Sequence, residues 1–418
     1  MSRKKQILFV HQNFPGQYRY LARHYAEDSS WDVFAIGERS CVKRQFALIP
    51  KNITILGYDL PPVKNNDVSS RVKDFARYVD RADALEKVLS RQKANGLSPD
   101  VILVHPGWGE AMYLKEIFPE SKLICFFEYY FSTTKNNIDF DPMLSSSLNQ
   151  KIHYRMSNTA SLIALDVADI GVSPTQWQLS TFPKVNQQNI HVVHDGVDTT
   201  KVKPSLATGI ELTTIDNRNI SLSKDEEIVS YSVRNLEPSR GFHRYMEALP
   251  ELQKSRPNAY FVIVGGDEKS YSGSHASGKS WREVMLGEVG SQLDLERVLF
   301  VGKIPYATLL NLFSITSLHI YMTSPFVLSW SMMEAMACEA PILASGTEPV
   351  KEVIDDNKNG VLFDYFSKED LVNKANYLLN TPDLCRSLGL QARKTIVEKY
   401  DLHTVCLPQH IKLIESDL

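Results

Sequence analysis

The sequence predicts an α/β protein built from two doubly wound, Rossmann-like domains. Short apolar runs typical of buried strands alternate with amphipathic stretches typical of helices, on both sides of the polar stretch 199–226. The chain has 418 residues, enough for two domains of ordinary size. We therefore expect an N-terminal domain over residues 1–200, a linker within 199–226, and a C-terminal domain over 201–401.

Composition narrows the class of protein. A hydrophobic content of 43% is typical of a globular protein with full cores, and a net charge of −3 gives no overall attraction to nucleic acid. The five cysteines form no CxxC pair, which argues against a disulfide framework or a zinc site. The start, MSRKKQILFV, enters a strand without a signal-peptide pattern, and no apolar run reaches the roughly 18 residues of a spanning helix. We expect a cytoplasmic protein whose membrane contact, if any, is peripheral, at the inner face.

The N-terminal domain begins with a strand–loop–helix unit. Gln6–Val10 is a short apolar strand, and Leu21 and Tyr25 mark one face of the following helix. Residues 13–17 then form the loop between them, where Gly16 lets the backbone approach a ligand closely, although a tight loop needs a glycine for geometry alone. Further strands are expected at 31–37 and 53–58.

A long helix is predicted over residues 70–93. Its apolar stripe includes Val72, Phe75, Val79, Leu85 and Leu89. The helix contains seven Lys or Arg residues and four acidic residues, and further basic residues occur between Arg39 and Lys51. A solvated outer face explains this charge pattern. That explanation is preferred; the alternative is a surface for anionic lipid or for an acceptor that carries a phosphate.

Two later strands of this domain end in residues suited to sugar binding. The strand Asp100–His105 runs into His-Pro-Gly-Trp-Gly-Glu, where Trp108 suits a sugar face and His105 or Glu110 suits its hydroxyls. The strand Lys122–Glu128 ends in Glu128. A helix around 150–166 and strands at 169–173 and 190–198 complete the domain.

The stretch YMTSPFVLSWSMMEAMACEAPILASGTEPV, residues 321–350, organises the second domain. It predicts a strand end, a turn at Ser324-Pro325, a short helix to about Cys338, and a buried strand after Pro341. The backbone amides of Leu328, Ser329 and Trp330 lie at the helix start, where unpaired N–H groups suit a phosphate or diphosphate. Glu334 lies one turn further on among small and apolar residues; two vicinal hydroxyls of a ribose would satisfy it, and so would the helix dipole.

The segment SMMEAMACEAPILAS resembles the LLEAMACGxPVxAS segment of retaining family-4 glycosyltransferases, which have the two-domain GT-B fold. The resemblance implies that Glu334 holds the nucleotide ribose and that the amides of Leu328 to Trp330 hold the diphosphate. It extends to a bacterial branch whose first loop is similar to HQNFPGQYRYLA, and that loop, with Gly16, would face the interdomain cleft.

Other motifs of the family recur along the chain. YSVRNLEPSRGFHRYMEAL is similar to GRLxxxKGxxxLxxA and places Arg234 and Arg240 at the diphosphate positions. RVLFVGKIPYATLLNLF is similar to VxFxGxVpxxxLxxLy, which implies that Gly302 and Ile304 line the nucleobase. HDGVD at 194–198 is similar to xNGVD at the domain crossover, and the last helix, 402–418, would return to the N-terminal domain.

The chain departs from the family at Phe326. The family places a glutamate eight residues before the Glu of EAM, and that carboxylate touches the donor sugar. In the family a side chain after the strand that ends here at Glu128 also touches this sugar. Glu128 is therefore the expected substitute, chosen over Glu110 and His105 because it lies at the end of a strand.

Two shorter motifs have a simpler interpretation. Asp139-Phe140-Asp141 matches the DxD pattern of metal-dependent glycosyltransferases of another fold, but it lacks the strand context and is interpreted as a loop feature. Residues 273–280, GSHASGKS, fit the P-loop pattern, yet the preceding strand ends seven residues earlier, so a phosphate role for Lys279 is the weaker interpretation.

These features together predict a retaining, hexosyltransferase-type enzyme that needs no metal or cofactor. It would transfer a sugar from a UDP- or GDP-linked donor to a hydroxyl of a glycan, glycolipid or small-molecule acceptor, in bacterial glycan or glycolipid synthesis. The expected catalytic residues are Arg234, Arg240, Glu128 and His105. A nucleotide-sugar epimerase on the same fold and a non-catalytic nucleotide-sugar-binding subunit are the alternatives.

Overall fold

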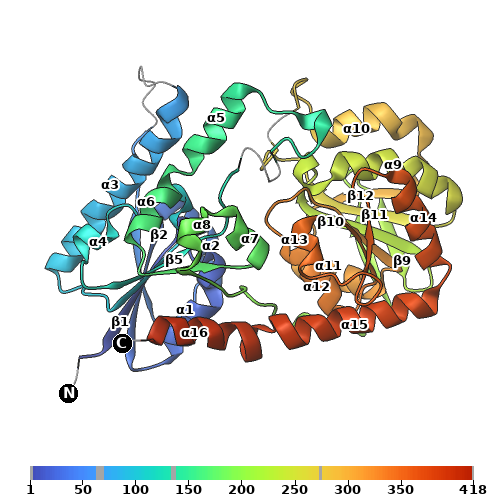
Figure 1. Cartoon of the computed structure of the whole chain (residues 1–418). Helices are drawn as coiled ribbons and strands as arrows, with labels where there is room; N and C mark the ends of the chain where they lie inside the picture. Colours follow the sequence, from blue (N-terminus) through green and yellow to red (C-terminus); the bar gives the residue numbers. More distant parts are fainter. Residues whose placement is uncertain (1–2, 63–69, 133–137, 273–274, 417–418) are drawn as a thin grey trace. The chain divides into compact units, whose positions relative to one another are not determined.

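The computed structural model describes residues 3–62, 70–132, 138–272 and 275–416 (Figure 1). The chain divides into two compact units. The first comprises residues 1–195 and 406–418, and the second comprises residues 196–405. Both units are α/β, with parallel sheets flanked by helices.

The first unit contains a seven-stranded parallel sheet in the order β3-β2-β1-β4-β5-β6-β7. Its strands are β1 Lys5–Val10, β2 Trp31–Glu38, β3 Ile53–Tyr58, β4 Val101–Val104, β5 Lys122–Phe126, β6 Ile170–Ser173 and β7 Ile190–Val192. Its helices are α1 Arg19–Glu27, α2 Arg39–Gln45, α3 Lys73–Ala94, α4 Leu114–Ile117, α5 Leu148–Ser157, α6 Thr159–Val167, α7 Gln176–Thr181, α8 Lys184–Gln187 and α16 Leu407–Glu415.

Both faces of this sheet are covered, which explains the continuous apolar strands. In β1, Leu8 and Val10 join the core beneath α3, α4 and α6, whereas Ile7 and Phe9 join the core beneath α1, α2 and α16. The helix predicted near 150–166 is divided at Asn158, whose side chain donates to the Phe131 carbonyl (2.8 Å) and accepts from the Phe131 amide (2.9 Å).

The second unit contains a six-stranded parallel sheet in the order β12-β11-β10-β13-β14-β15 and a two-stranded antiparallel sheet, β8-β9. Its strands are β8 Gly209–Thr213, β9 Asn219–Ser223, β10 Ile228–Asn235, β11 Tyr260–Gly266, β12 Val298–Gly302, β13 Leu318–Tyr321, β14 Ile342–Ser345 and β15 Val361–Phe363. Its helices are α9 Phe242–Ser255, α10 Trp281–Val289, α11 Tyr306–Ile315, α12 Trp330–Ala337, α13 Glu348–Lys351, α14 Lys368–Leu379 and α15 Pro382–Tyr400.

The polar stretch 199–226 is not a linker, contrary to the expectation. It folds into β8 and β9, which place Ile210, Leu212 and Leu222 in a core shared with β11, β12 and α11. The alternation of apolar and polar residues in these two strands gives them one buried face, and Asn217, at φ 65°, is in the turn between them. The junctions between the two units lie instead at residues 195–196 and 405–406.

Each large sheet has a topological switch point. In the first sheet, β1 lies between β2 and β4, so the chain builds strands first on one side of β1 and then on the other. In the second sheet, β10 lies in the same way between β11 and β13. Crevices for ligands form outside the carboxyl ends of strands at such points. The loops after β1, β4 and β5 in the first unit, and after β10 and β13 in the second, are therefore the places to look for a site.

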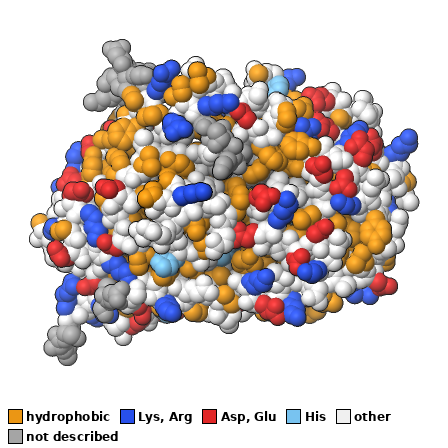
Figure 2. All heavy atoms as spheres, in the orientation of Figure 1, with side chains coloured by type: hydrophobic (Ala, Val, Ile, Leu, Met, Phe, Trp, Pro, Cys, Tyr) orange, Lys and Arg blue, Asp and Glu red, His pale blue; other side chains and the backbone are white. Residues whose placement is uncertain are grey.

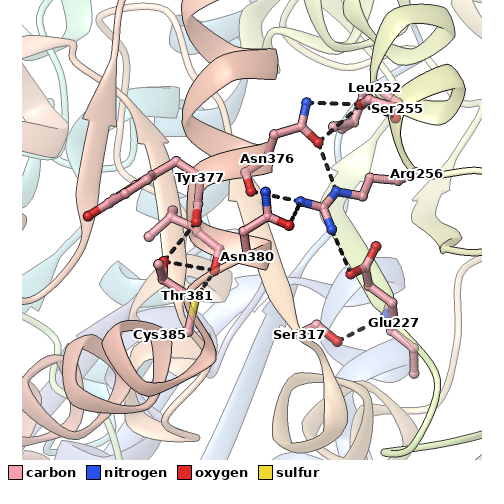
Figure 3. A network of polar contacts seen from close by, with 12 residues as sticks. Glu227, Leu252, Ser255, Arg256, Ser317, Asn376, Tyr377, Asn380, Thr381 and Cys385 are labelled. Carbon is pink, nitrogen blue, oxygen red and sulfur yellow. Dashed lines mark hydrogen bonds and ion pairs between the residues drawn. The ribbon is translucent and has the colours of Figure 1, made fainter.

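At the amino ends of the strands of the second sheet, Arg256, which directly follows α9, forms a network of polar contacts (Figure 3). Its guanidinium donates to Asn376 Oδ1 (2.8 Å), the Asn376 carbonyl (2.8 Å) and Asn380 Oδ1 (2.6 Å), and it pairs with Glu227 (3.3 Å) just before β10. This network joins the end of α9, the start of β10 and the end of α14.

Among the described residues, no helix is long and apolar enough to cross a membrane. On the face drawn in Figure 2, basic and acidic side chains are interspersed, in agreement with a net charge of −3.

Candidate active site

The start of α12 lies where the sequence predicted it, after the loop that follows β13. Ser329 caps the helix and accepts from the Ser331 amide at 3.3 Å. Of the three amides predicted to face a phosphate, that of Ser329 donates instead to the Tyr321 hydroxyl at 3.0 Å. The amides of Leu328 and Trp330 have no hydrogen-bond partner among the described residues.

Arg240 is a buried arginine of the second unit. Its side chain is 8% exposed, and one guanidinium nitrogen donates to the Val327 carbonyl at 2.8 Å and to Thr323 Oγ1 at 3.4 Å. In the part of the chain that the structure describes, it forms no ion pair with a carboxylate. The buried carboxylate of the same turn, Glu237, accepts instead from the Ser272 amide at 2.9 Å. Within the described residues, Arg240 is thus a buried cation without a carboxylate counter-ion.

Two aromatic rings flank this guanidinium. Its central carbon lies 5.5 Å from the ring centroid of Phe326 and 5.9 Å from that of Tyr271, and the two rings are 4.7 Å apart. Phe326 is buried, and the position therefore presents an apolar ring beside Arg240 where the family pattern has a carboxylate. Tyr271 belongs to the segment after β11, which Ser272 fixes by a hydrogen bond from the Ser239 amide to its Oγ (2.8 Å).

Arg234, near the end of β10, is exposed and forms no ion pair within the described residues. The pKa of Glu268 is lowered first by its hydrogen bond from Lys303 and less strongly by the charge of Arg234. Arg234 therefore lies close to the loop after β11, on the carboxyl side of the sheet.

Glu334 is partly buried on α12 and already has one partner. The hydroxyl of Tyr306, the first residue of α11, donates to its Oε1 at 2.6 Å. Burial raises the pKa of Glu334, and this hydrogen bond acts against the rise. Gly302 adopts φ 63° at the end of β12, and Ile304 lies half-buried in the loop that leads to Tyr306.

In the first unit, the loop after β1 closes over a histidine that the sequence analysis did not single out. A Cβ on Gly16 would lie 2.5 Å from His11 Cε1, and Gly16 has φ 47°, so only glycine fits there. His11 Nδ1 accepts from the Asn13 amide (2.9 Å), which leaves Nε2 to donate to Gln17 Oε1 (2.8 Å). Burial and then the nearby His105 lower the pKa of His11 to about 3, so the ring is neutral.

Glu128 is joined to this histidine through Gln17. Gln17 donates to Glu128 Oε1 at 3.4 Å, and His105 Nε2 lies 3.7 Å from Glu128 Oε2. Burial raises the pKa of Glu128, but His105, His11 and Gln17 together outweigh it and hold that pKa below its usual value. The structure thus brings Glu128 and His105 together, with a carboxylate that stays ionised near neutral pH.

Trp108 and Glu110, from the same loop as His105, have different positions. Trp108 stacks on His105, with ring centroids 4.3 Å apart. Glu110 is completely buried; it accepts from the Tyr58 hydroxyl at 2.8 Å and lies 3.6 Å from Arg81 Nε. Glu110 is therefore unavailable to a sugar and holds the loop in place, which corrects the expectation that it binds hydroxyls.

The basic helix α3 is less basic at its surface than its sequence indicates. Arg81 is buried and pairs with Glu38 (3.3 Å) as well as with Glu110. Arg77 donates to the Pro61 carbonyl at 2.8 Å, and Lys93 donates to the Ile117 carbonyl. These three cations maintain the fold and do not form a free basic stripe.

The DxD-like motif at 139–141 and the described part of the P-loop-like stretch at 273–280 form local contacts. Asp139 accepts from the Ser146 amide (2.6 Å) and pairs with Lys151, while Asp141 accepts from the Met143 amide (3.0 Å). Of the P-loop-like stretch, Gly273 and Ser274 lie outside the described residues, and Ser280 caps α10 through a capping box with Glu283. Within the described residues, no cluster of three His, Cys, Asp or Glu could hold a metal ion.

The sequence analysis missed His11, Tyr271 and Tyr306. His11 was signalled by its place directly after a strand and before a glycine loop. Tyr306 and Tyr271 had no such signal, because their importance depends on partners 28 and 55 residues away that only the fold brings near.

Comparisons with known proteins agree with this architecture. Residues 29–202 match the family model "Glycosyl transferase family 4 group", and residues 214–395 match "Glycosyl transferases group 1". Among curated relatives, the alpha-maltose-1-phosphate synthase of Mycolicibacterium smegmatis is 21% identical over 258 residues, which cover 59% of this chain and 63% of that protein.

Solved structures show the same fold at low identity. The sucrose-phosphate synthase of Thermosynechococcus elongatus superposes with a TM-score of 0.73 at 17% identity, covering 98% of both chains. Anabaena HepE in complex with UDP gives 0.67 at 15% identity, covering 98% of this chain and 99% of that one. The two family matches, one on each unit, together with the two parallel sheets, identify the chain as a glycosyltransferase of the GT-B fold.

Proposed function

We propose that the protein is a retaining family-4 glycosyltransferase that transfers a hexose-type sugar from a UDP- or GDP-linked donor to a hydroxyl, without a metal. The observation that carries this proposal is Arg240, a buried guanidinium that forms no ion pair with a described carboxylate.

A buried cation without a counter-ion is costly, since removal of a charge from water costs several kcal/mol unless an opposite charge replaces the solvent. Arg240 lies at the carboxyl edge of the second sheet, in the loop after β10, and bonds the backbone of the loop that leads to α12. Leu328 belongs to that same loop, and Trp330 is the first residue of α12. A guanidinium and helix-start amides together suit a diphosphate.

The chemistry follows from this charge. When the sugar–phosphate bond breaks, negative charge develops on the leaving diphosphate, and a preorganised cation stabilises that charge without solvent rearrangement. Arg240 would do this from a buried position, and Arg234 would add a second, exposed cation. The leaving diphosphate would then assist attack of the acceptor hydroxyl on the same face of the sugar, which retains the configuration.

The comparisons support a nucleotide-sugar donor. HepE has been solved with UDP and with UDP-glucose, and the relative from Mycolicibacterium smegmatis is a synthase of a glycosyl phosphate. These facts concern those proteins; the acceptor proposed for this chain is a glycan, a glycolipid or a small molecule.

Glu128 and His105 are proposed to hold the donor sugar. A carboxylate that stays ionised can accept hydrogen bonds from two hydroxyls, and His105 fixes its direction. The apolar ring of Phe326 makes this role necessary, because the second unit offers no carboxylate at that position.

A surface of the first unit is proposed to contact anionic lipid at the inner face of a membrane. This surface comprises exposed residues of α2 and of the segment after it. Its cations are Arg39, Lys43, Arg44 and Lys51. Its hydrophobic side chains are Phe46, 67% exposed, and Leu48, 40% exposed. No acidic residue occurs between Arg39 and Tyr58. Cations around an exposed aromatic residue fit an anionic interface.

Vesicle flotation with anionic lipid tests this surface. We expect recovery in the floated fraction to fall when Lys43 and Arg44 become Gln, and again at moderate salt. The matched control replaces Lys254 and Lys394, exposed lysines of the second unit, by Gln. Equal recovery of wild type and the Lys43/Arg44 variant would end this part of the proposal.

The main test is a thermal-shift panel of nucleoside diphosphates and their sugars, followed by turnover with and without acceptor. A binding nucleotide should raise the melting temperature, and sugar release should require an acceptor and survive EDTA. Consumption of the sugar nucleotide without an acceptor would identify an epimerase. Binding without turnover would identify a non-catalytic subunit, and a loss in EDTA that Mg²⁺ or Mn²⁺ reverses would restore the metal interpretation of Asp139 and Asp141.

A further inference from the structure

We infer that Tyr306 is a positioning residue that orients the Glu334 carboxylate for the ribose diol of a bound nucleotide. Tyr306 opens α11 and Glu334 lies on α12, yet the phenol hydroxyl and Glu334 Oε1 are 2.6 Å apart. The inference rests on the proposed function and concerns a residue that sequence motifs do not mark.

The geometry gives the hydrogen bond a task. Along α12, Glu334 is preceded by Met333 and followed by Ala335, which are buried and carry no polar side-chain group. Among the described residues, the Tyr306 hydroxyl is its one hydrogen-bond partner. A phenol–carboxylate bond of this length is charge-assisted and fixes the direction of the carboxylate.

The carboxylate retains capacity for a ligand. Two ionised oxygens offer about four acceptor positions, of which Tyr306 uses one. Two vicinal hydroxyls can use two more, so the carboxylate can bind a ribose diol without releasing Tyr306. The side chain of Tyr306 is 53% exposed, which places it at the surface where a ligand would arrive.

The hydrogen bond also affects the protonation of Glu334. Burial raises its pKa and Tyr306 lowers it. Other titratable groups at α12 are the Tyr321 hydroxyl, which accepts from the Ser329 amide and whose pKa is raised by burial, and the Cys338 thiol, whose pKa is raised first by burial and also by the charge of Glu334. Arg393 of α15 pairs with Glu339 at 3.8 Å. Arg393 also donates to the Ala337 carbonyl. Without Tyr306, the pKa of Glu334 would rise, and a larger fraction of the carboxyl would be protonated and unable to accept from two hydroxyls.

The test measures the affinity of wild type, Tyr306→Phe and Glu334→Ala for one nucleoside diphosphate, for its 2′,3′-dideoxy analogue and for inorganic pyrophosphate, by calorimetry. Tyr377→Phe is the matched control, since Tyr377 is 57% exposed on α14 (Figure 3). We expect Tyr306→Phe to weaken the ribonucleotide roughly tenfold, the scale of one hydrogen bond to a charged group. Its affinities for the dideoxy analogue and for pyrophosphate should equal those of wild type.

Two further readouts separate positioning from a structural effect. The loss in Tyr306→Phe should shrink as the pH rises from mildly acidic to mildly alkaline, because a Glu334 with a raised pKa becomes ionised again. Tyr306→Phe should cause no additional loss in a Glu334→Ala background.

An equal loss for the ribonucleotide and the dideoxy analogue, or no loss for either, would overturn the inference while wild type still binds nucleotide. Failure of wild type to bind any nucleoside diphosphate would instead overturn the proposed function, so the two failures are distinguishable.

Discussion

Arg256 and Arg240 belong to the same domain, are 16 positions apart in the sequence, and differ in almost every physical respect. Arg256 donates to two asparagines and pairs with Glu227, so its charge and its donors are satisfied within the protein. Arg240 is more deeply buried, donates to the Val327 carbonyl and to Thr323, and forms no ion pair with a described carboxylate. Arg256 is at the amino edge of the sheet and Arg240 is at the carboxyl edge.

This difference separates stability from function. A satisfied guanidinium contributes to the folded state, and its removal leaves buried partners unpaired. A buried guanidinium without a counter-ion opposes folding, because its desolvation is not offset, and its charge is available for a ligand. Arg81 of α3 belongs with Arg256, because Glu38 and Glu110 meet its charge, although its sequence context suggested a surface role.

The largest expected effect is on catalysis. Arg240→Met should lower kcat by about 100- to 1000-fold, or about 2.7–4 kcal/mol of transition-state stabilisation, because the leaving diphosphate loses a preorganised cation. Steady-state kinetics with the donor found in the thermal-shift panel measures it. Turnover at the wild-type rate would remove Arg240 from the site and erase the contrast with Arg256.

Glu128→Gln should follow, with kcat reduced by one to three orders of magnitude, or roughly 1.4–4 kcal/mol. Its affinity for free nucleoside diphosphate should stay that of wild type, since Glu128 is proposed to touch the sugar alone. Glu334→Ala should weaken the free nucleotide first. If both variants weakened free nucleotide equally, Glu128 would not be a sugar ligand.

Arg256→Met should destabilise the second unit by about 1–3 kcal/mol, because Asn376, Asn380 and Glu227 lose their shared partner. Thermal unfolding measures this change, with Arg386→Met as control, since Arg386 is exposed and pairs only with exposed Asp383. A melting temperature equal to that of the control would show that the network does not stabilise the fold.

The smallest effect concerns pH. Burial lowers the pKa of His319 to about 3, and the Ser230 hydroxyl lies 2.9 Å from its Nδ1. The unfolded chain binds this proton below about pH 6.5 and the folded chain does not, so stability falls as the pH drops from about 6.5 toward 3. His319→Gln should remove up to about 1.4 kcal/mol per pH unit of that slope. An unchanged slope by denaturant titration at several pH values would contradict the assignment.

Much of the fold could be predicted from sequence, since strands buried on both faces, such as Ile7 to Val10, are apolar at every position. The start of α12 and the place of Glu334 were also predictable from local pattern. The hairpin of β8 and β9 was missed because its polar composition concealed the alternation of Ile210, Leu212 and Leu222.

The candidate site was less predictable, because its properties depend on distant partners. Glu110 cannot bind a sugar because Tyr58 and Arg81, 52 and 29 positions away, already engage its carboxylate. The engagement of the Ser329 amide depends on the Tyr321 hydroxyl, and the lack of a counter-ion at Arg240 depends on the direction of Glu237. The sequence shows which residues are charged, but only the fold shows which of these charges already have a partner within the protein.

The most direct measurement is therefore the nucleotide-induced shift in melting temperature of wild type, Arg240→Met and Arg256→Met, at one saturating concentration of nucleoside diphosphate. At 100 times the dissociation constant, a ligand stabilises the native state by about 2.7 kcal/mol. Arg256→Met should melt lower than wild type without ligand and gain the full shift. Arg240→Met should melt at or above the wild-type temperature without ligand, because it removes a buried charge, and should gain little from the nucleotide. A full shift in Arg240→Met, or a lost shift in Arg256→Met, would contradict the assignment of the diphosphate to the unpaired arginine.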